Sequence, residues 1–258
     1  MQRCFMNSIQ RRKEIFTQLE QNQTVYIAEI SQILNVSAMT IRRDLNRLAD
    51  QGLVTLIRGG AALNRGAALE YSSRFRKSQY PEEKYRIAKY CANLVTEGSS
   101  VFIDCGTTAE KIAEMLVMKK NIMAMTMSLP AANILSTAKD LRFIMAPGLF
   151  HEKPLGFMGQ LTSDFISRFK IDILFLGANG LDLVHGATTP DLIDAETKQS
   201  LVQQAEKVVL ATSHTKFGLS YFMRIAALKD IDLIVTDKAA DPKLVQEMRD
   251  AGVDIVLV

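Results

Sequence analysis

The sequence contains few of the residues that form disulfides or bind metal ions in small proteins. Its 258 residues include three cysteines, three histidines, six prolines, 14 glycines and no tryptophan. The cysteines, Cys4, Cys91 and Cys105, form no CxxC pair, which excludes a disulfide scaffold and favours a reducing cytoplasm. Because the histidines are scattered, we expect no metal site, and we expect no other cofactor.

Long apolar runs are also absent. The longest uncharged run covers residues 121–138 and contains Pro130 with several Asn, Ser and Thr side chains, so it predicts a buried strand and a helix start instead of a membrane span. Hydrophobic residues make up 48% of the chain and charged residues 23%, a balance that permits a sizeable core and differs from that of a disordered chain. We therefore expect a cytoplasmic protein with one large domain or two smaller ones and no membrane partner.

The net charge of +3 hides an uneven distribution. Residues 1–80 contain 12 Lys and Arg against six Asp and Glu, whereas residues 81–258 contain 19 against 22. A basic module followed by a mildly acidic one predicts that the first part contacts a polyanion and that the second has another task.

The basic N-terminal part has the periodicity of a helix-turn-helix with a wing. Apolar spacing predicts helices over 8–19, 28–34 and 37–50. A strand is predicted over 53–57, and the Gly-Gly pair after it predicts a tight turn into a return strand. Two helices joined by a short turn and followed by a β-hairpin form a winged helix-turn-helix.

The third predicted helix has one apolar face and one cationic face. Ile41, Leu45 and Leu48 share the core side, while arginines and small polar residues occupy the opposite side. An arginine guanidinium can donate two hydrogen bonds to one guanine, and Ser or Thr hydroxyls can hydrogen-bond to phosphates or base edges. A solvated helix face explains any single arginine equally well, but the helix, its turn and the wing together favour binding of double-stranded DNA. The predicted DNA-binding residues are Ser37, Met39, Thr40, Arg42, Arg43, Arg47 and Arg58.

Strands and helices alternate in the larger, C-terminal part. Continuous apolar runs such as 100–104 and 172–176 are typical of buried parallel strands, and the alternation predicts a doubly wound α/β domain. We predict a winged helix-turn-helix DNA-binding domain over 1–62, a linker over 63–83 and an α/β effector-binding and oligomerisation domain over 84–258.

Four polar loops follow predicted strands, at the edge where ligands bind in such sheets. They cover 104–108, 177–182, 186–191 and 213–218, and they are rich in Gly, Thr, Asp and Lys. Glycine permits close approach of the backbone, a helix N-terminus attracts anions, and a lysine can pair with one. The four loops together predict a site for a small, polar, anionic ligand such as a sugar phosphate.

Plainer explanations exist for each of these features. Gly-Thr-Thr is also an ordinary helix cap, and Lys216 can also be explained as a solvated loop lysine. Asp194 and Lys198 are four residues apart on a predicted helix, a spacing that also suits a surface ion pair.

Six short motifs stand out across both parts of the chain: VSAMTIRRDL (36–45), RGGA (58–61), DCGTT (104–108), TMSL (126–129), TTPD (188–191) and KFG (216–218). Together they closely resemble the DeoR family of bacterial transcriptional regulators. The resemblance implies a repressor of sugar-catabolic genes that a phosphorylated sugar induces, with a sensor domain similar in fold to ribose-5-phosphate isomerase. Met127 stands where the family usually has Asn, and Asp194 stands where Glu is common.

The loops and the resemblance together define a predicted effector site. We expect a homodimer or homotetramer, which would match palindromic half-sites on the operator, and we expect no enzyme activity. The predicted effector-binding residues are Asp104, Gly106, Thr107, Thr108, Ser128, Asp182, Thr188, Thr189, Asp191, Lys198 and Lys216.

Two alternatives stay open at the level of sequence. A phosphosugar isomerase with an appended DNA-binding module would use Asp182, Asp191 and Lys198 as acid and base groups. A DNA-binding protein whose α/β domain has lost its ligand and only oligomerises would also fit, because methionine at position 127 removes a hydrogen-bonding amide.

Overall fold

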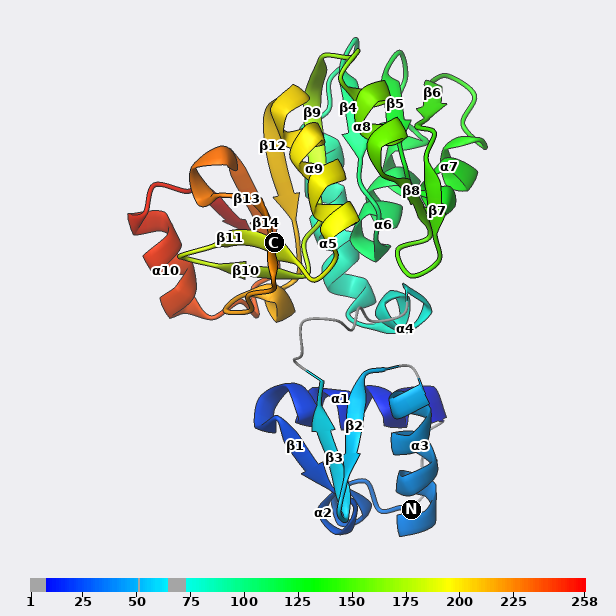
Figure 1. Cartoon of the computed structure of the whole chain (residues 1–258), viewed down its shortest axis with the longest axis vertical. Coiled ribbons are helices and arrows are strands. Elements are labelled where there is room, and N and C mark those ends of the chain that lie inside the picture. Colours follow the sequence, from blue (N-terminus) through cyan, green and yellow to red (C-terminus); the bar gives the residue numbers. More distant parts are fainter. Residues whose placement is uncertain (1–7, 51, 65–72) are drawn as a thin grey trace. The chain divides into compact units, whose positions relative to one another are not determined.

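A computed structural model describes residues 8–50, 52–64 and 73–258 of the chain (Figure 1). The chain divides into two compact units, with the boundary between Ser72 and Ser73. Cys91 and Cys105 are free, buried thiols, and Cys4 lies outside the described residues. None of the helices within these ranges is both long and apolar enough to span a membrane.

The first unit is a winged helix-turn-helix, as the sequence predicts. Its three strands form an antiparallel sheet in the order β1-β3-β2, and the β2–β3 hairpin is the wing. The elements are α1 (Ser8–Asn22), β1 (Thr24–Tyr26), α2 (Ile27–Ile33), α3 (Ala38–Asp50), β2 (Val54–Ile57) and β3 (Gly60–Leu63).

Local signals set the ends of α3. The Ser37 hydroxyl accepts a hydrogen bond from the Thr40 amide at 3.2 Å and so caps the first turn. Beyond the last turn, Gly52 has a φ of +71°, which glycine adopts without a steric penalty. Ile41 and Leu48 are fully buried where α3 contacts α1, α2 and the wing, so the predicted apolar side of the helix faces the core of its unit.

The second unit is built around a seven-stranded parallel sheet in the order β15-β14-β12-β9-β4-β5-β6. Successive strands run outward from β4 in one direction and from β9 in the other, so the chain order reverses between these two neighbours. This is the doubly wound topology that the sequence predicts. The strands are β4 (Ser100–Ile103), β5 (Met123–Thr126), β6 (Arg142–Met145), β9 (Ile171–Leu176), β12 (Ala205–Ala211), β14 (Leu233–Thr236) and β15 (Ile255–Leu257).

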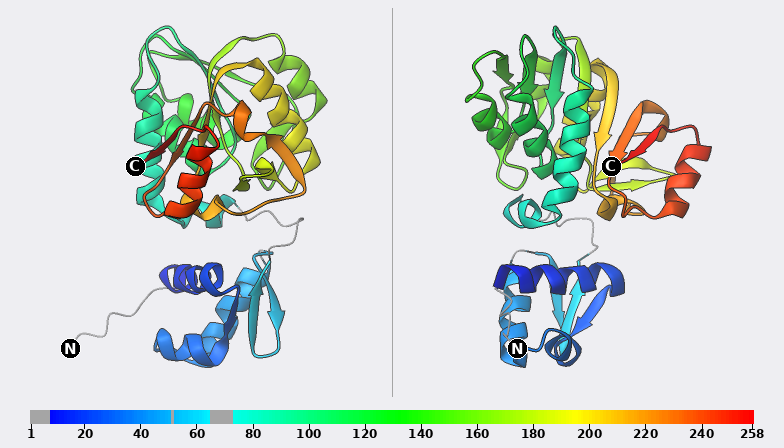
Figure 2. Two further views of the ribbon diagram at one scale, coloured as in Figure 1. Left: turned by 90° about the vertical axis from the view of Figure 1, so that its left-hand side faces the viewer. Right: turned by 180° about the vertical axis from the view of Figure 1, so that it is seen from behind.

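Helices cover both faces of this sheet. Successive strand residues point to opposite faces, so Val101 and Ile103 pack with α5, α6 and α7, whereas Phe102 packs with α8, α9 and α10. Figure 1 shows α8 and α9 in front of the sheet, and the rear view in Figure 2 shows α5 on the other side. The helices are α4 (Ser73–Ser78), α5 (Pro81–Asn93), α6 (Thr107–Leu116), α7 (Leu129–Leu135), α8 (Gln160–Ile166), α9 (Leu192–Gln204) and α10 (Pro242–Asp250), with 3-10 turns η1 (His214–Lys216) and η2 (Leu228–Asp230).

Two small antiparallel sheets correct part of the loop prediction. β7 (Leu149–His151) pairs with β8 (Gly156–Met158), and β10 (Gly180–Asp182), β11 (Gly186–Thr189) and β13 (Met223–Ala226) form a three-stranded sheet. The segments predicted as polar loops over 177–182 and 186–191 therefore contain strands. Their short Gly- and Thr-rich stretches lack an apolar run, and the pairing with β13, which is distant in sequence, stabilises them.

The predicted linker range, 63–83, contains regular structure. Leu63 ends β3, α4 begins at Ser73, and α5 begins at Pro81, while 65–72 lie outside the described residues. Proline suits the first position of a helix because the amide that it lacks has no intrahelical partner there. The helical part of the second unit thus begins before residue 84.

Gly60 generates a prediction about the wing. A Cβ at this position would lie 2.1 Å from the Val25 carbonyl oxygen of β1, so we expect Gly60→Ala to destabilise the first unit by about 2 kcal/mol. Gly59→Ala is the matched control, because Gly59 has a φ of +80° but open surroundings. This substitution should lower the free energy of unfolding by only about 1 kcal/mol. Thermal denaturation followed by circular dichroism measures both, and a smaller loss at Gly60 than at Gly59 would contradict the packing argument.

Candidate functional site

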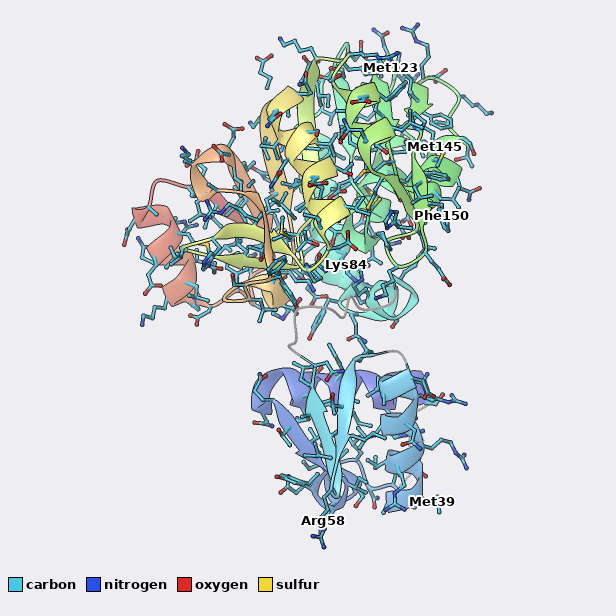
Figure 3. The ribbon with its side chains drawn as sticks, in the orientation of Figure 1. Met39, Arg58, Lys84, Met123, Met145 and Phe150 are labelled. Carbon is cyan, nitrogen blue, oxygen red and sulfur yellow. The ribbon has the colours of Figure 1, made fainter. Side chains whose placement is uncertain are left out.

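The outer face of α3 presents a row of guanidinium groups. Arg42, Arg43 and Arg47 are exposed, and Met39 is 65% exposed near the start of the helix. Arg58 is exposed in the turn of the wing. Figure 3 shows Met39 and Arg58 at the same end of the unit, so the start of α3 and the tip of the wing can meet one partner. This arrangement suits a helix in the major groove with a wing on the adjacent backbone.

The two predicted hydroxyl contacts lie at the N-terminus of α3. Ser37 Oγ caps the helix and lies 2.9 Å from Thr40 Oγ1. Ser37 is exposed and Thr40 is half-buried. The free amides of a helix N-terminus and such hydroxyls are typical phosphate contacts, which position a recognition helix on the duplex.

A buried carboxylate anchors α3 from its inner side. Asp44 is 2% exposed, and its carboxylate lies 2.5 Å from Arg11 Nε and 3.4 Å from Arg12 Nη1, both on α1. Sequence reasoning missed this pair. Its only local signal is an acidic residue between two core residues, Ile41 and Leu45, on an otherwise apolar face.

The carboxyl edge of the parallel sheet collects several predicted effector-binding residues. β4 leads into Asp104, β5 into the loop with Ser128, and β12 into η1 with Lys216. Gly177 follows β9, the neighbour of β4 at the point where the chain order reverses. Doubly wound proteins bind their ligands at this position.

A buried lysine joins two carboxylates here. Lys198 Nζ lies 3.1 Å from Asp104 Oδ2 and 3.1 Å from Asp194 Oδ1, and it donates a hydrogen bond to the Gly177 carbonyl oxygen at 3.3 Å. The side chains of Lys198 and Asp194 are each 6% exposed. The explanation of these two residues as a surface ion pair is therefore wrong. Asp194 was missing from the predicted site, although its i,i+4 spacing to Lys198 was visible.

Asp104 is fixed by the backbone around it. Its carboxylate accepts hydrogen bonds from the Cys105 amide at 2.6 Å and the Gly177 amide at 2.8 Å. Burial raises the pKa of Asp104 to about 6; the Lys198 charge opposes this rise and the Asp194 charge adds to it. Since two carboxylates share one ammonium, the cluster retains acceptor capacity for the hydroxyl groups of a polar ligand.

The segment after Asp104 leads directly into α6. Gly106 precedes the helix with a φ of +122°, a conformation that favours glycine. Thr107 is buried and Thr108 is half-buried in the first turn, where helix amides have no intrahelical partner. Together with the positive end of the helix dipole, these amides and the Thr108 hydroxyl suit a phosphate group.

Other predicted effector residues have local structural roles. Ser128 and Asp191 cap α7 and α9, accepting hydrogen bonds from first-turn amides at 3.3 and 2.9 Å. Asp182 is the last residue of β10, and its carboxylate accepts hydrogen bonds from the Val184 and His185 amides of the following turn at 2.7 and 2.8 Å. The Thr188 hydroxyl accepts a hydrogen bond from the Tyr221 amide at 3.0 Å. The Thr189 hydroxyl is buried without a hydrogen-bond partner in the part of the chain that the structure describes.

Two more observations define the chemistry of this edge. Met127 is fully buried in the same core cluster as Cys105, so the side chain at this unusual position packs in the interior. Across residues 8–50, 52–64 and 73–258, no three His, Cys, Asp or Glu side chains are grouped as a metal site would require.

The Lys198 cluster generates a prediction about stability. Lys198→Met leaves two buried carboxylates without their cation, so we expect it to destabilise the second unit by roughly 3–5 kcal/mol at pH 7.5. Without Lys198 the pKa of Asp104 rises further, so its protonation removes the repulsion between the Asp104 and Asp194 carboxylates. The loss of stability caused by the substitution should therefore shrink towards pH 5. Chemical denaturation of the full chain at pH 7.5 and pH 5 measures the free energy of unfolding.

Lys243→Met is the matched control for this experiment. Lys243 forms an i,i+4 pair with Glu247 at 3.8 Å, and its side chain is 82% exposed, so its loss should cost less than about 1 kcal/mol at either pH. Equal effects of the two substitutions, or a Lys198 deficit that does not change with pH, would contradict the proposed electrostatics.

Full-length relatives are found among known transcriptional regulators. The chain is 33% identical over 252 residues to the glycerol-3-phosphate regulon repressor of Escherichia coli (strain K12), covering 98% of this chain and 100% of that protein. It is 31% identical over 235 residues to the HTH-type transcriptional regulator IolR of Bacillus subtilis (strain 168), covering 91% and 93%. Among solved structures, ribose 5-phosphate isomerase A from Methanocaldococcus jannaschii matches with a TM-score of 0.39 and 14% identity over 53% of this chain and 54% of that one.

Two family models cover most of the chain. The model of the DeoR-like helix-turn-helix domain matches residues 11–66, and the model of the DeoR C-terminal sensor domain matches residues 79–238. The two matches follow the two structural units, and the sequence relatives extend over both. This chain therefore belongs to the DeoR family of transcriptional regulators.

Proposed function

We propose that this protein represses genes of carbohydrate breakdown and is released from operator DNA by a small phosphorylated sugar or polyol. The observation that carries the proposal is the exposed arginine face of α3, with Arg58 at the same end of the unit. The names of the relatives support the regulatory class, and the Escherichia coli relative makes glycerol 3-phosphate the first compound to test.

The effector half of the proposal rests on two chemically different features at one sheet edge. The Gly106 turn and the first turn of α6 suit a phosphate group. The Lys198 cluster, with Asp104 and Asp194, suits hydroxyl groups. A phosphorylated sugar or polyol presents both kinds of group in one small molecule.

A regulator without enzyme activity fits the geometry better than a phosphosugar isomerase. Of the three acid and base candidates, Asp182 is committed to a hairpin turn and Asp191 to a helix cap. Lys198 is engaged by two carboxylates and by the Gly177 carbonyl oxygen, so its ammonium has a structural partner on each of these sides.

Release from DNA follows from a shift between states of an oligomer. An operator with two half-sites requires a fixed spacing between two recognition helices, which a homodimer or homotetramer supplies. An effector that binds better to a different arrangement of subunits shifts the population away from the DNA-binding state. Light scattering coupled to size-exclusion chromatography tests the oligomer, and a monomer at working concentration would contradict this mechanism.

The DNA interface can be tested with single arginines. Arg42→Ala and Arg43→Ala should each lower operator affinity about tenfold or more, because one good arginine contact to a base is worth about 1–3 kcal/mol. Fluorescence anisotropy on a duplex selected from genomic fragments with the wild-type protein measures the change. Arg86→Ala, an exposed arginine on α5, is the control, and equal affinity of all variants would rule out α3 as the reading element.

The effector can be tested by stabilisation of the full chain. Saturating glycerol 3-phosphate should stabilise the second unit by about 2–4 kcal/mol, whereas glycerol, which lacks the phosphate, should not. Lys216→Ala should require about tenfold more glycerol 3-phosphate for the same shift, because it removes a charged partner of the phosphate. If glycerol and glycerol 3-phosphate act alike, the phosphorylated class is the wrong one.

A further inference from the structure

Met39 is an apolar side chain on the face of α3 that carries the arginines. It is 65% exposed, more than any other large hydrophobic side chain among the described residues of the first unit. An exposed methionine leaves apolar surface in water, so a contact that covers it is favourable. The exposed residues of the next two turns of α3 are instead polar or charged: Arg42, Arg43, Asn46 and Arg47.

Helical geometry places Met39 beside two of these arginines. Arg42 and Arg43 follow it by three and four residues, so the three side chains share one face of α3. The rise along the helix axis over this spacing is about 5 Å, whereas neighbouring base pairs are about 3.4 Å apart. On a duplex, the bases that Met39 and the two arginines reach therefore lie within about two base pairs of one another.

The start of α3 is the part of the helix that a base edge can approach. Met39 is the second residue of α3, and recognition helices contact base edges with their N-terminal residues. Figure 3 shows Met39 at the same end of the unit as Arg58, the wing residue expected at the DNA backbone. The candidate interface thus directs an apolar side chain towards the bases.

One feature of the bases matches this side chain. In the major groove every base pair presents hydrogen-bond donors or acceptors, and thymine alone adds an apolar group, its C5 methyl. The methionine thioether has no donor and is only a weak acceptor, so it gains little from the polar groups. Its unbranched, flexible chain packs readily against a small apolar group.

We propose that Met39 determines specificity by packing against the C5 methyl of a thymine in each operator half-site. This thymine lies within about two base pairs of a guanine that Arg42 or Arg43 contacts. The inference rests on the proposed function and adds to it a chemical feature of the operator, which neither the basic charge nor the arginines specify.

The experiment is a uracil scan of the duplex selected with the wild-type protein, measured by fluorescence anisotropy with the full chain. Uracil in place of thymine removes the methyl and keeps every hydrogen-bonding group of the base edge. Each thymine of a half-site is replaced in turn. At one of them, uracil should weaken binding of the wild type about fivefold, the effect of losing one buried methyl group.

Variants at position 39 connect this loss to the methionine. Met39→Ala should bind the thymine duplex about fivefold more weakly than wild type, and uracil at that position should weaken it no further, because the contact is already lost. Met39→Gln, of similar length but with a polar end, should lose the uracil effect too. Met118→Ala is the matched control, since Met118 is 83% exposed in the second unit, and it should behave as wild type.

Salt dependence distinguishes an apolar contact from a lost charge. Met39→Ala should leave the slope of log affinity against log salt concentration as in wild type. Arg58→Ala, which removes a cation expected at a phosphate, should reduce the magnitude of that slope by about one. A reduced slope for Met39→Ala would mean that the variant disturbs the phosphate contacts, and it would overturn the assignment.

The outcomes separate this inference from the proposed function. A uracil scan without effect in wild type, or an undiminished uracil effect in Met39→Ala, would overturn the role of Met39, while losses in Arg42→Ala and Arg43→Ala would still support α3 as the reading element. If Met39→Ala fails to fold by circular dichroism, Met39→Gln decides. If wild type selects no fragment above non-specific binding, operator binding fails and the thymine contact fails with it.

Discussion

The second unit depends on one buried interaction, the contact of the Lys198 ammonium with the carboxylates of Asp104 and Asp194. These residues come from the end of β4 and from two turns of α9, and the Gly177 carbonyl brings in the end of β9. The interaction therefore joins the two halves of the sheet at the point where their strand order reverses. Burial of three charges without a compensating network would be unfavourable, and the amides of Cys105 and Gly177 complete that network. The proposed site for polar groups and the integrity of the fold thus rest on the same side chains.

The two units differ in whether their main charged side chains lie on the surface or in the interior. In the first unit exposed arginines lie on the outer face of α3, and the inner face of α3 is apolar except for Asp44. In the second unit the charges of the ion-pair cluster, Asp104, Asp194 and Lys198, lie inside. Surface charges suit a long polyanion that approaches from solvent, whereas buried charges suit a small ligand that must be desolvated to bind. This difference supports the proposal that the first unit binds operator DNA and the second binds a small effector.

The sequence predicted those helices and strands whose ends or burial are determined by residues close by in the chain. The cap at Ser37, the glycine after α3 and the apolar runs of the parallel strands each lie within a few residues of the structure that they form, and the two-part architecture followed from them. Strands β10 and β11 were missed because their stability comes from pairing with β13, far along the chain. Within the candidate site, the loop at Asp104 was visible as a strand followed by Gly-Thr-Thr. The burial of Asp194 was not visible, since spacing on a helix does not reveal what packs against it.

Because Asp44 contacts Arg11 and Arg12, the first unit presents less positive charge to DNA than its basic composition indicates. The side chains of Arg11 and Arg12 are 13% and 15% exposed and face a carboxylate, so they contribute little to the field outside the protein. In the proposed interface, the outward guanidinium groups of α3 and the wing displace the condensed cations that a duplex gives up on binding. The steepness with which ionic strength weakens the complex therefore reflects those groups, and the formal charge of the N-terminal unit overstates it.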